Sequence, residues 1–231
     1  MSPVGDSISV LLVDDHAVVR EGYRRLLERA SNIAVVGEAA SAAAAYQAYC
    51  RSIPDVVVMD ISLPDVSGIE AMRRLLQRDP RARVLVFSIH DESVFADRAF
   101  KGGARGYVTK ASAPDVLVDA VRAVARGDTF LSPDVAQAVA MRALRGNDAE
   151  SLRSLSDREF EIVRLLAQGR SVREIAELLC LNYKTVANYQ WTIRQKLGAE
   201  TAVQLLRIAA ENGLDLRTAD ESVERRERSR R

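Results

Sequence analysis

The first 126 residues alternate short apolar runs with longer amphipathic segments. Apolar runs lie at residues 8–13, 33–39, 55–60, 83–88 and 106–109. Runs of this length that are bounded by turn residues are typical of buried strands. Segments with helical spacing lie between them, at residues 16–30, 42–51, 68–77, 92–101 and 113–126. Strands that alternate with helices of this length predict a doubly wound α/β domain around a five-stranded parallel sheet.

From residue 152 onward the pattern becomes entirely helical. Two predicted helix starts have the pattern of a capping box, in which a serine stands three residues before a glutamate. They are Ser156 with Glu159 and Ser171 with Glu174, and each pair precedes an apolar face. A short turn at 180–183 leads to a helix of about residues 184–197, and a last helix spans about 201–212. Two short helices joined by a tight turn predict a small all-α helix-turn-helix domain, whose second helix enters the major groove of DNA.

These patterns divide the chain into two domains, a connector and a tail. We expect the domains at residues 1–126 and 152–214 and a disordered charged tail at 215–231. Between the domains, a connector at residues 127–151 should contain a helix. The tail alternates Arg and Glu with few apolar residues, which is typical of disorder. Such a tail either contacts DNA phosphates or stays solvated, and its composition leaves both alternatives open.

Composition narrows the class of protein. The 231 residues are 48% hydrophobic and 28% charged, with a net charge of +1, which is ordinary for a globular chain. No apolar stretch approaches the roughly 18 residues of a membrane span, and the N-terminus lacks a signal-peptide pattern, so we expect a cytoplasmic protein without membrane contact. The two cysteines and two histidines show no metal-ligand spacing, which excludes a structural zinc site.

Charged residues stand at the ends of three predicted strands. Asp14 and Asp15 follow the first strand, Asp60 ends the third, and Lys110 follows the fifth. Because sites form at the carboxyl ends of strands in parallel sheets, we expect three carboxylates and one ammonium group at one edge. Crowded carboxylates repel one another and lose hydration. A divalent cation such as Mg²⁺, together with the ammonium group, would relieve that repulsion.

This edge has the groups that a phosphoryl acceptor needs. An Asp side chain can act as the nucleophile that forms an acyl phosphate, and Ser88 ends the fourth strand with a hydroxyl group. Tyr107 precedes Lys110 by three residues, so alternation puts the two side chains on opposite sides, with Tyr107 pointing either inward or outward. Taken singly, each Asp could merely cap a helix or end a strand. Taken together, the set indicates a magnesium-assisted phosphoryl acceptor.

Three motifs around these residues match a known family in order and spacing. They are LLVDDH at 11–16, VVMDISLP at 57–64 and GYVTKA at 106–111. By these motifs, residues 8–126 resemble the receiver domain of bacterial two-component response regulators. The resemblance implies a flavodoxin-like fold and a sensor histidine kinase as partner.

The resemblance also implies roles for individual residues. Asp60 would accept a phosphoryl group from a kinase histidine. The residues implied as Mg²⁺ ligands are Asp15 directly, Asp14 through water, Asp60, and Ser62 through its carbonyl group. The residues implied at the phosphoryl oxygens and in the switch are Ser88, Lys110 and Tyr107. The family more often has Thr at the position of Ser88, and Ser keeps the hydroxyl group while losing the methyl group.

The predicted helix at 184–197 has two different faces. Val186, Ile193 and Leu197 share one face, which should pack inward. The other face carries Lys184, Ala187, Asn188, Gln195 and the single tryptophan of the chain, Trp191. Asn suits bidentate contacts with adenine, and an apolar ring suits thymine methyl groups. The alternatives are that Trp191 folds back over the neighbouring helix and that Lys184 and Arg194 are merely solvated charges.

A second group of motifs matches a DNA-binding domain. They are LSDRE at 155–159, IAELL at 175–179, KTV at 184–186 and KLG at 196–198. By these motifs, residues 152–214 resemble the LuxR-type output domain of the NarL/FixJ subfamily. The resemblance implies base contacts from Ala187, Asn188 and Trp191, and phosphate contacts from around Lys184, Tyr189 and Lys196.

The chain departs from that subfamily at two of these positions. The subfamily often has Lys where this chain has Ala187, and His where it has Tyr189. Because Ala has no side-chain donor for guanine, we expect base recognition to depend on Asn188 and Trp191.

These observations predict a phosphorylation-dependent transcriptional regulator and not an enzyme. Phosphorylation of Asp60 is expected to free the output domain, favour a homodimer and allow binding to double-stranded promoter DNA. One alternative is an aspartyl-phosphate hydrolase that uses Asp60 and Mg²⁺, but no cap insertion is visible between the strands. The other is a DNA-binding protein that never uses its receiver, which would leave the crowded charges without a role.

Overall fold

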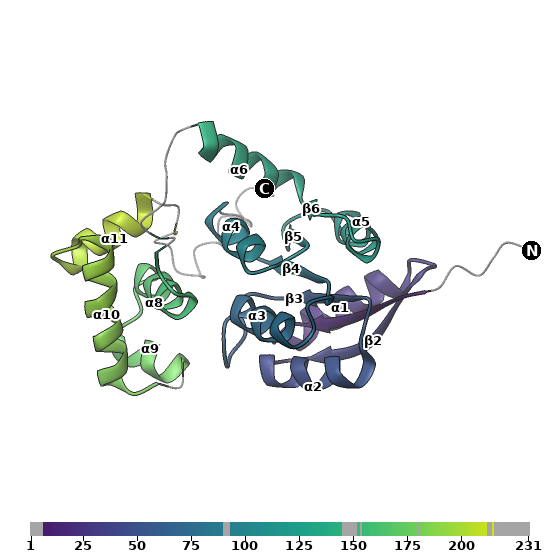
Figure 1. Cartoon of the computed structure of the whole chain (residues 1–231), viewed down its shortest axis with the longest axis horizontal. Helices are drawn as coiled ribbons and strands as arrows, with labels where there is room; N and C mark the ends of the chain where they lie inside the picture. The colour runs from purple at the N-terminus through teal and green to yellow at the C-terminus, as the bar shows by residue number, and fades with distance from the viewer. Residues whose placement is uncertain are drawn as a thin grey trace, which may run out of the picture. The chain divides into compact units, whose positions relative to one another are not determined.

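Parallel strands form the core of the N-terminal part of this protein (Figure 1). The computed structural model describes residues 7–89, 93–144, 152, 154–179, 181–211 and 214. The chain divides into two compact units, Met1–Leu144 and Arg145–Arg231. In the described part of the first unit, six strands pair in the order β2-β1-β3-β4-β5-β6. They are β1 (Ile8–Val13), β2 (Ile33–Ala39), β3 (Val56–Met59), β4 (Val84–Ser88), β5 (Gly106–Thr109) and β6 (Phe130–Leu131).

Helices cover both faces of this parallel sheet (Figure 1). They are α1 (Ala17–Glu28), α2 (Ala42–Ser52), α3 (Gly68–Arg78), α4 (Ser93–Lys101), α5 (Pro114–Ala125) and α6 (Pro133–Leu144). Alternate strand residues such as Val10 and Leu12 pack with Leu27 of α1 and Val121 of α5 in one apolar cluster. Fully burying an aliphatic side chain of this size contributes about 1.5–3 kcal/mol. The predicted doubly wound α/β class is therefore confirmed.

The sheet has one strand more than the five predicted. Phe130 of β6 pairs with Gly106, and Leu131 pairs with Tyr107, in parallel register. A two-residue strand is too short to show an alternating apolar pattern, so its sequence gave no strand signal. It forms because Gly127, with φ of 91°, turns the chain after α5 and returns it to the edge of β5.

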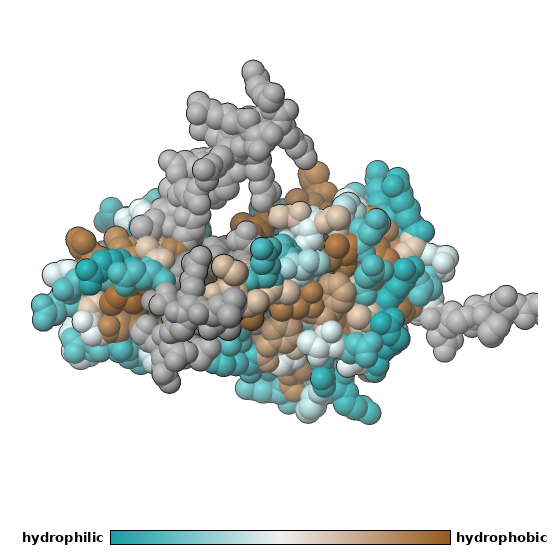
Figure 2. Space-filling view, turned by 90° about the horizontal axis from the view of Figure 1, so that it is seen from above, coloured by the Kyte–Doolittle hydropathy of each residue, from teal (hydrophilic) through white to brown (hydrophobic). Residues whose placement is uncertain are grey.

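The predicted connector is part of the first unit as far as residue 144. The sequence placed the end of the first domain at residue 126, whereas β6 and α6 pack within Met1–Leu144. Helix α6 lies against α4 and β5. Its outer surface shows Val139 and Met141, which are 37% and 45% exposed. Figure 2, seen from the side on which α6 lies, shows apolar residues among the polar ones.

The second unit is helical where it is described. Its helices are α8 (Asp157–Ala167), α9 (Val172–Leu178), α10 (Tyr183–Leu197) and α11 (Ala202–Glu211). Both predicted capping boxes are present, at the starts of α8 and α9. Helix α10 starts one residue earlier than predicted because the Asn182 side chain accepts a hydrogen bond from the Thr185 N–H.

Two predictions are limited by the part of the chain that the structure describes. The charged tail at residues 215–231 lies outside the described residues. Among the residues that are described, no helix combines the length and the apolar character needed to cross a bilayer.

Candidate functional site

The ends of β1, β3 and β5 bring three charged residues together at one edge of the sheet. The register pairs Val13 with Met59, so Asp14 and Asp60 follow neighbouring strand ends. The Lys110 Nζ atom lies 2.6 Å from Asp14 Oδ2 and 2.6 Å from Asp60 Oδ2. The predicted convergence of carboxylates and an ammonium group is therefore confirmed for Asp14, Asp60 and Lys110.

Both carboxylates that contact Lys110 are buried. Asp14 is 2% exposed and Asp60 is 3% exposed. Burial raises the pKa of Asp60, although the ion pair with Lys110 acts in the opposite direction. Burial also acts to lower the pKa of Lys110, but the neighbouring Asp60 and Asp14 outweigh it and raise that pKa. The ammonium group therefore stays charged at neutral pH and offsets part of the repulsion between the carboxylates.

Asp15 supplies a further carboxylate in the turn after β1. Nδ1 of His16 lies 2.7 Å from Asp15 Oδ1, but without hydrogen-bond geometry, so this buried oxygen has no hydrogen-bond partner. Ligand atoms of Asp14, Asp15 and His16 lie within 4.8 Å of one another. A buried carboxylate oxygen without a donor, next to a second carboxylate, fits a hard cation such as Mg²⁺. His16 lies outside the ligand set that the sequence predicts.

Backbone contacts fix the loop that follows Asp60. The Ser62 N–H donates to Asp60 Oδ1 at 3.2 Å, which places Ser62 beside this carboxylate, while its carbonyl group as a Mg²⁺ ligand stays a prediction. The Gly68 N–H donates to the Ile61 carbonyl at 2.8 Å. A Cβ atom on Gly68 would lie 1.9 Å from the Asp60 carbonyl oxygen. Any side chain at this position would therefore displace the backbone of Asp60.

Ser88 and Tyr107 are both fully buried on the strands next to the acidic edge. Ser88 ends β4, and its carbonyl group accepts a hydrogen bond from the Lys110 N–H at 2.7 Å. Tyr107 lies in β5 with 0% exposure. Of the two orientations that the sequence left open, the structure has the inward one. The roles of both residues in a switch stay predictions.

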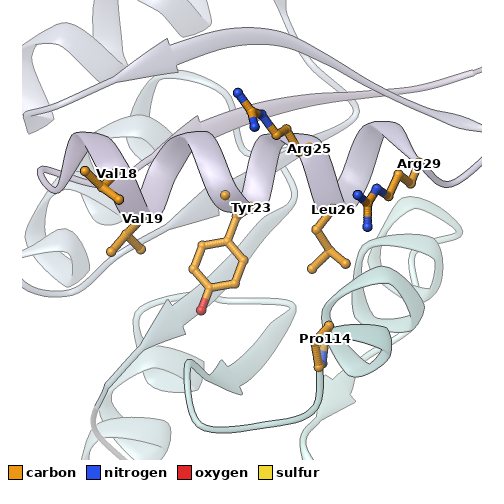
Figure 3. Close-up of a pocket in the computed structure, with 8 residues that line it drawn as sticks. Val18, Val19, Tyr23, Arg25, Leu26, Arg29 and Pro114 are labelled. Carbon is orange, nitrogen blue, oxygen red and sulfur yellow. The ribbon is translucent and has the colours of Figure 1, made fainter. Parts of the chain in front are cut away.

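An aromatic pair connects this edge with α1. The rings of Tyr23 and Phe87 meet edge to face with centroids 4.5 Å apart, and Lys110 Nζ lies 5.9 Å from the Phe87 centroid. Burial raises the pKa of Tyr23 above its usual range. Tyr23 and Leu26 also line a hollow of about 480 Å³ between α1 and the start of α5 at Pro114 (Figure 3). The hollow thus borders an aromatic pair whose Phe87 ring lies near Lys110.

In the second unit, α10 has the two faces that the sequence predicts. Val186 and Ile193 are fully buried, whereas Trp191 is 60% exposed, and Lys184 and Asn188 are exposed as well. Trp191 therefore does not fold back over a neighbouring helix. The solvent face of α10 presents an ammonium group, an amide and an aromatic ring, which are groups that suit the phosphates and base edges of DNA.

The other predicted DNA-contact residues are less accessible or already paired. Ala187 and Tyr189 are half-buried. The Lys196 Nζ atom donates to Glu159 Oε2 at 2.7 Å, and the same oxygen accepts a hydrogen bond from the Ser156 N–H at 2.6 Å. Lys196 therefore joins α10 to the capping box of α8. Contact with a DNA phosphate would require Lys196 to leave Glu159, so that predicted role stays untested.

Comparison with known proteins identifies the family. Residues 10–122 match the response regulator receiver domain, and residues 153–209 match the luxR family of bacterial regulatory proteins. The response regulator UvrY of Escherichia coli K12 is 38% identical over 209 residues, which cover 90% of this chain and 95% of UvrY. The chain is a response regulator of the NarL/FixJ family. The response regulator GacA of Pseudomonas aeruginosa is 36% identical over 208 residues, or 90% of this chain and 97% of GacA.

Solved structures of response regulators have the same architecture. A LuxR-family response regulator from Aurantimonas is 50% identical, with a TM-score of 0.59, and covers 60% of this chain and 99% of its own. RcsB of Salmonella enterica serovar Typhimurium, bound to a promoter in the presence of the phosphomimetic BeF₃⁻, is 25% identical, with a TM-score of 0.66, and covers 89% and 100%. This response regulator thus joins a receiver domain to a LuxR-type DNA-binding domain.

Some residues that shape the receiver site escaped the sequence analysis. Arg20 of α1 donates from Nη1 to the Asp14 carbonyl at 2.6 Å and from Nε to Glu38 at 2.8 Å. Arg24, one turn later, donates to the other carboxylate oxygen of Glu38. The spacing of the two arginines on one helix face was visible in the sequence. Their shared partner on β2 was not, because the pairing depends on how α1 packs.

Proposed function

We propose that Asp60 of this response regulator accepts a phosphoryl group from a sensor histidine kinase, and that phosphorylation favours a homodimer that binds double-stranded promoter DNA. The observation that carries this proposal is the position of Lys110 Nζ, 2.6 Å from both Asp60 and Asp14. A cation held at the acceptor carboxylate can contact the oxygens of an incoming phosphoryl group. The membership of the chain in a family of DNA-binding transcription regulators supports the second half of the proposal.

In the proposed transfer, Asp60 supplies the nucleophile and a phosphohistidine supplies the phosphoryl group. An Asp60 carboxylate oxygen attacks the phosphorus atom of the donor, an O–P bond forms, and the P–N bond of the kinase phosphohistidine breaks. The histidine nitrogen then takes a proton from water. Lys110 pairs with a phosphoryl oxygen once Asp60 is phosphorylated, and the Ser88 hydroxyl donates to another. The products are an acyl phosphate and an unmodified histidine.

The carboxylates at this edge also fit a magnesium ion. Asp14, Asp15 and Asp60 would hold it, with the Ser62 carbonyl group as a further ligand. When bound, Mg²⁺ would neutralise charge on the phosphoryl oxygens. The close approach of the Asp14 and Asp15 ligand oxygens, within 4.8 Å of each other, supports this assignment.

The output step follows from the exposed face of α10. Lys184 is placed to contact a phosphate group, and Asn188 and Trp191 to contact base edges, while Ala187, Tyr189 and Lys196 border that face. RcsB, which shares this architecture, has been solved bound to a promoter and, in another structure, as two dimers bound to two parallel DNAs. By analogy, two copies of the LuxR-type domain would bind two half-sites. We place this activity in the cytoplasm, where promoter DNA is accessible.

Phosphoryl transfer is tested by labelling the full chain with acetyl phosphate and Mg²⁺ and separating the products on a phosphate-affinity gel. Wild type should shift, and Asp60→Asn should not, because an amide is not a nucleophile for phosphorus. Asp65→Asn is the matched control: Asp65 lies in the same loop but accepts hydrogen bonds from Ala42 and Ala43 at the start of α2. Equal labelling of Asp60→Asn and wild type would contradict the proposal.

Phosphate release, DNA affinity and oligomeric state, measured on the labelled chain, separate the two alternative functions. Continuous release of phosphate from a small phosphate ester, at many turnovers per chain, would indicate an aspartyl-phosphate hydrolase. Labelling of Asp60 that leaves DNA affinity and oligomeric state unchanged would indicate a DNA-binding protein that does not use its receiver. We expect labelling at one phosphate per chain, slow release, and a change in DNA affinity.

A further inference from the structure

Beyond the end of β5, the chain returns to the phosphoacceptor edge at α6. The Ser132 N–H donates to the Tyr107 carbonyl at 3.0 Å, which extends the pairing of β6 with β5. Helix α6 starts at the next residue, Pro133. The first turn of α6 is therefore fixed against the strand that leads to Lys110. It places Asp134 beside the end of that strand.

Three side chains meet at this point. Thr109 Oγ1 donates to Asp134 Oδ2 at 2.5 Å, Ser112 Oγ donates to Asp134 Oδ1 at 3.2 Å, and the two hydroxyl oxygens lie 2.9 Å apart. Thr109 is fully buried. Each hydroxyl group has a single hydrogen atom, so only two of the three contacts hold a hydrogen at one time. The Asp134 carboxylate can accept a hydrogen bond from both hydroxyl groups. An amide of similar size would bring N–H donors of its own.

Thr109 directly precedes Lys110 in the chain. Alternation along β5 puts their side chains on opposite sides of the strand end. Lys110 points to Asp14 and Asp60, and Thr109 points to Asp134. The backbone between them is held by the Lys110 N–H bond to the Ser88 carbonyl and by the Ser112 N–H bond to the Thr109 carbonyl, at 2.7 and 3.1 Å. A displacement of the Thr109 side chain would therefore shift the backbone that carries Lys110.

We infer that Asp134 is a positioning residue for the phosphoacceptor site: it fixes Thr109 and Ser112 and thereby holds Lys110 at Asp60. The inference rests on the proposed function of Asp60. Asp134 lies outside residues 10–122, which match the receiver family model. The receiver site of this chain is thus completed by a helix that follows the matched domain. In the chain, α6 is the last helix of the first unit.

A purely local role for Asp134 makes a different prediction. Asp134 lies in the first turn of α6, where a carboxylate is favourable because of the helix dipole. Burial acts to raise the pKa of Asp134, but the Ser132 side chain and, after it, the Thr109 hydroxyl and the backbone N–H groups of the first turn outweigh it and hold the pKa below its usual range. If helix capping were its whole role, removing the carboxylate would lower stability and leave phosphoryl transfer unchanged.

The test uses the full chain with acetyl phosphate as donor and Mg²⁺ in the buffer. We measure the rates of phosphorylation and of phosphate loss, the affinity for BeF₃⁻, and the midpoint of thermal unfolding. Asp134→Asn and Thr109→Val should each change the phosphorylation rate by about fivefold or more, because Lys110 is then less well placed. Thr109→Ser retains the hydroxyl group and should restore the rate to within about twofold of wild type.

A double-mutant cycle makes the test specific. Asp134→Asn combined with Thr109→Val should change the rate no more than the larger single effect, because both variants break one contact. Asp128→Asn is the control, since Asp128 is an exposed carboxylate whose side chain is paired with Arg126. It should leave all rates at the wild-type value.

Two outcomes would overturn the inference. In the first, Asp134→Asn and Thr109→Val shift the unfolding midpoint while all phosphorylation rates and the BeF₃⁻ affinity stay within about twofold of wild type. In the second, the two substitutions act additively on the rates. Failure of the proposed function is recognised separately, because wild type would then be labelled to the same extent as Asp60→Asn.

Discussion

At the scale of single residues, Lys110 is the cation that compensates the charge of two buried carboxylates. Its ammonium group lies between Asp14 and Asp60, which are each at most 3% exposed. A buried ion pair is weak evidence for net stability, because the desolvation of its charges opposes their attraction. Removal of one partner is different, since the remaining charges are then buried without compensation. Lys110 is therefore needed for stability even before any phosphoryl group arrives.

This leads to a stability prediction for Lys110→Met. Without added Mg²⁺, the free energy of unfolding should fall by about 3–5 kcal/mol, because two buried carboxylates lose their cation. Asp60→Asn in the same chain should restore part of the loss. Lys101→Met is the control: Lys101 is half exposed and lies 3.4 Å from Asp97, so its loss should cost less than about 1 kcal/mol. Urea unfolding followed by circular dichroism measures these differences.

A second residue-scale prediction compares two glycines. Gly68→Ala should destabilise the chain by about 1–3 kcal/mol and slow phosphorylation, because the added carbon would overlap the Asp60 carbonyl. Gly22→Ala should stabilise it by about 0.5–1 kcal/mol, because Gly22 lies within α1 and an added carbon would have no neighbour within 4 Å. If Gly68→Ala and Gly22→Ala changed the free energy of unfolding by the same amount, the steric argument would be contradicted.

At the scale of elements, α10 is held by both its start and its end. The Asn182 side chain caps its first turn, and Lys196 near its end contacts Glu159 of α8. Glu159 also closes the capping box with Ser156. The orientation of α10 is therefore fixed by an ion pair and by the buried residues Val186 and Ile193.

The Glu159 contact predicts a pH dependence. Burial acts to raise the pKa of Glu159, but Lys196 and Ser156 outweigh it and lower the pKa. A carboxylate with a lowered pKa in the folded state stabilises the fold above its unfolded pKa of about 4.3, and this contribution is lost as the pH falls further. The difference in unfolding midpoint between wild type and Glu159→Gln should thus be largest near pH 6 and shrink below about pH 4. Emission of Trp191, the single tryptophan, reports on this unit.

The exposed face of α10 predicts separable effects on DNA binding. Trp191→Ala and Asn188→Ala should each weaken binding to a cognate site by about 1–3 kcal/mol without a loss of stability, because both side chains are exposed. Lys184→Ala should weaken binding to all sequences and reduce the salt slope by about one. Fluorescence anisotropy at several salt concentrations measures both. A Trp191→Ala chain that binds as well as wild type would contradict the predicted face.

At the scale of the whole molecule, the proposed function requires that phosphorylation of the receiver controls the DNA-binding unit. The proposal predicts that acetyl phosphate shifts wild type toward a dimer and raises DNA affinity by about tenfold or more, whereas Asp60→Asn does not respond. Sedimentation velocity with and without donor measures the first effect, and titration with promoter DNA measures the second. A dimer that is equally stable with and without acetyl phosphate would indicate that DNA binding does not depend on the receiver.

The sequence by itself determined the class of each domain and most of the receiver site. Strand and helix periods are local properties, and parallel strands bring their carboxyl ends to one edge. The positions of Asp14, Asp60 and Lys110 follow from these two facts. The predicted faces of α10 follow from helical spacing in the same way.

Only the tertiary structure decided the contacts between side chains far apart in the chain. It added β6 to the sheet, tied Asp134 to Thr109, and paired Lys196 with Glu159. None of these has a local signal, because each depends on which surfaces meet when the elements pack. A residue's neighbours along the chain reveal its secondary structure, whereas its partner across the fold is chosen by the packing of the whole unit.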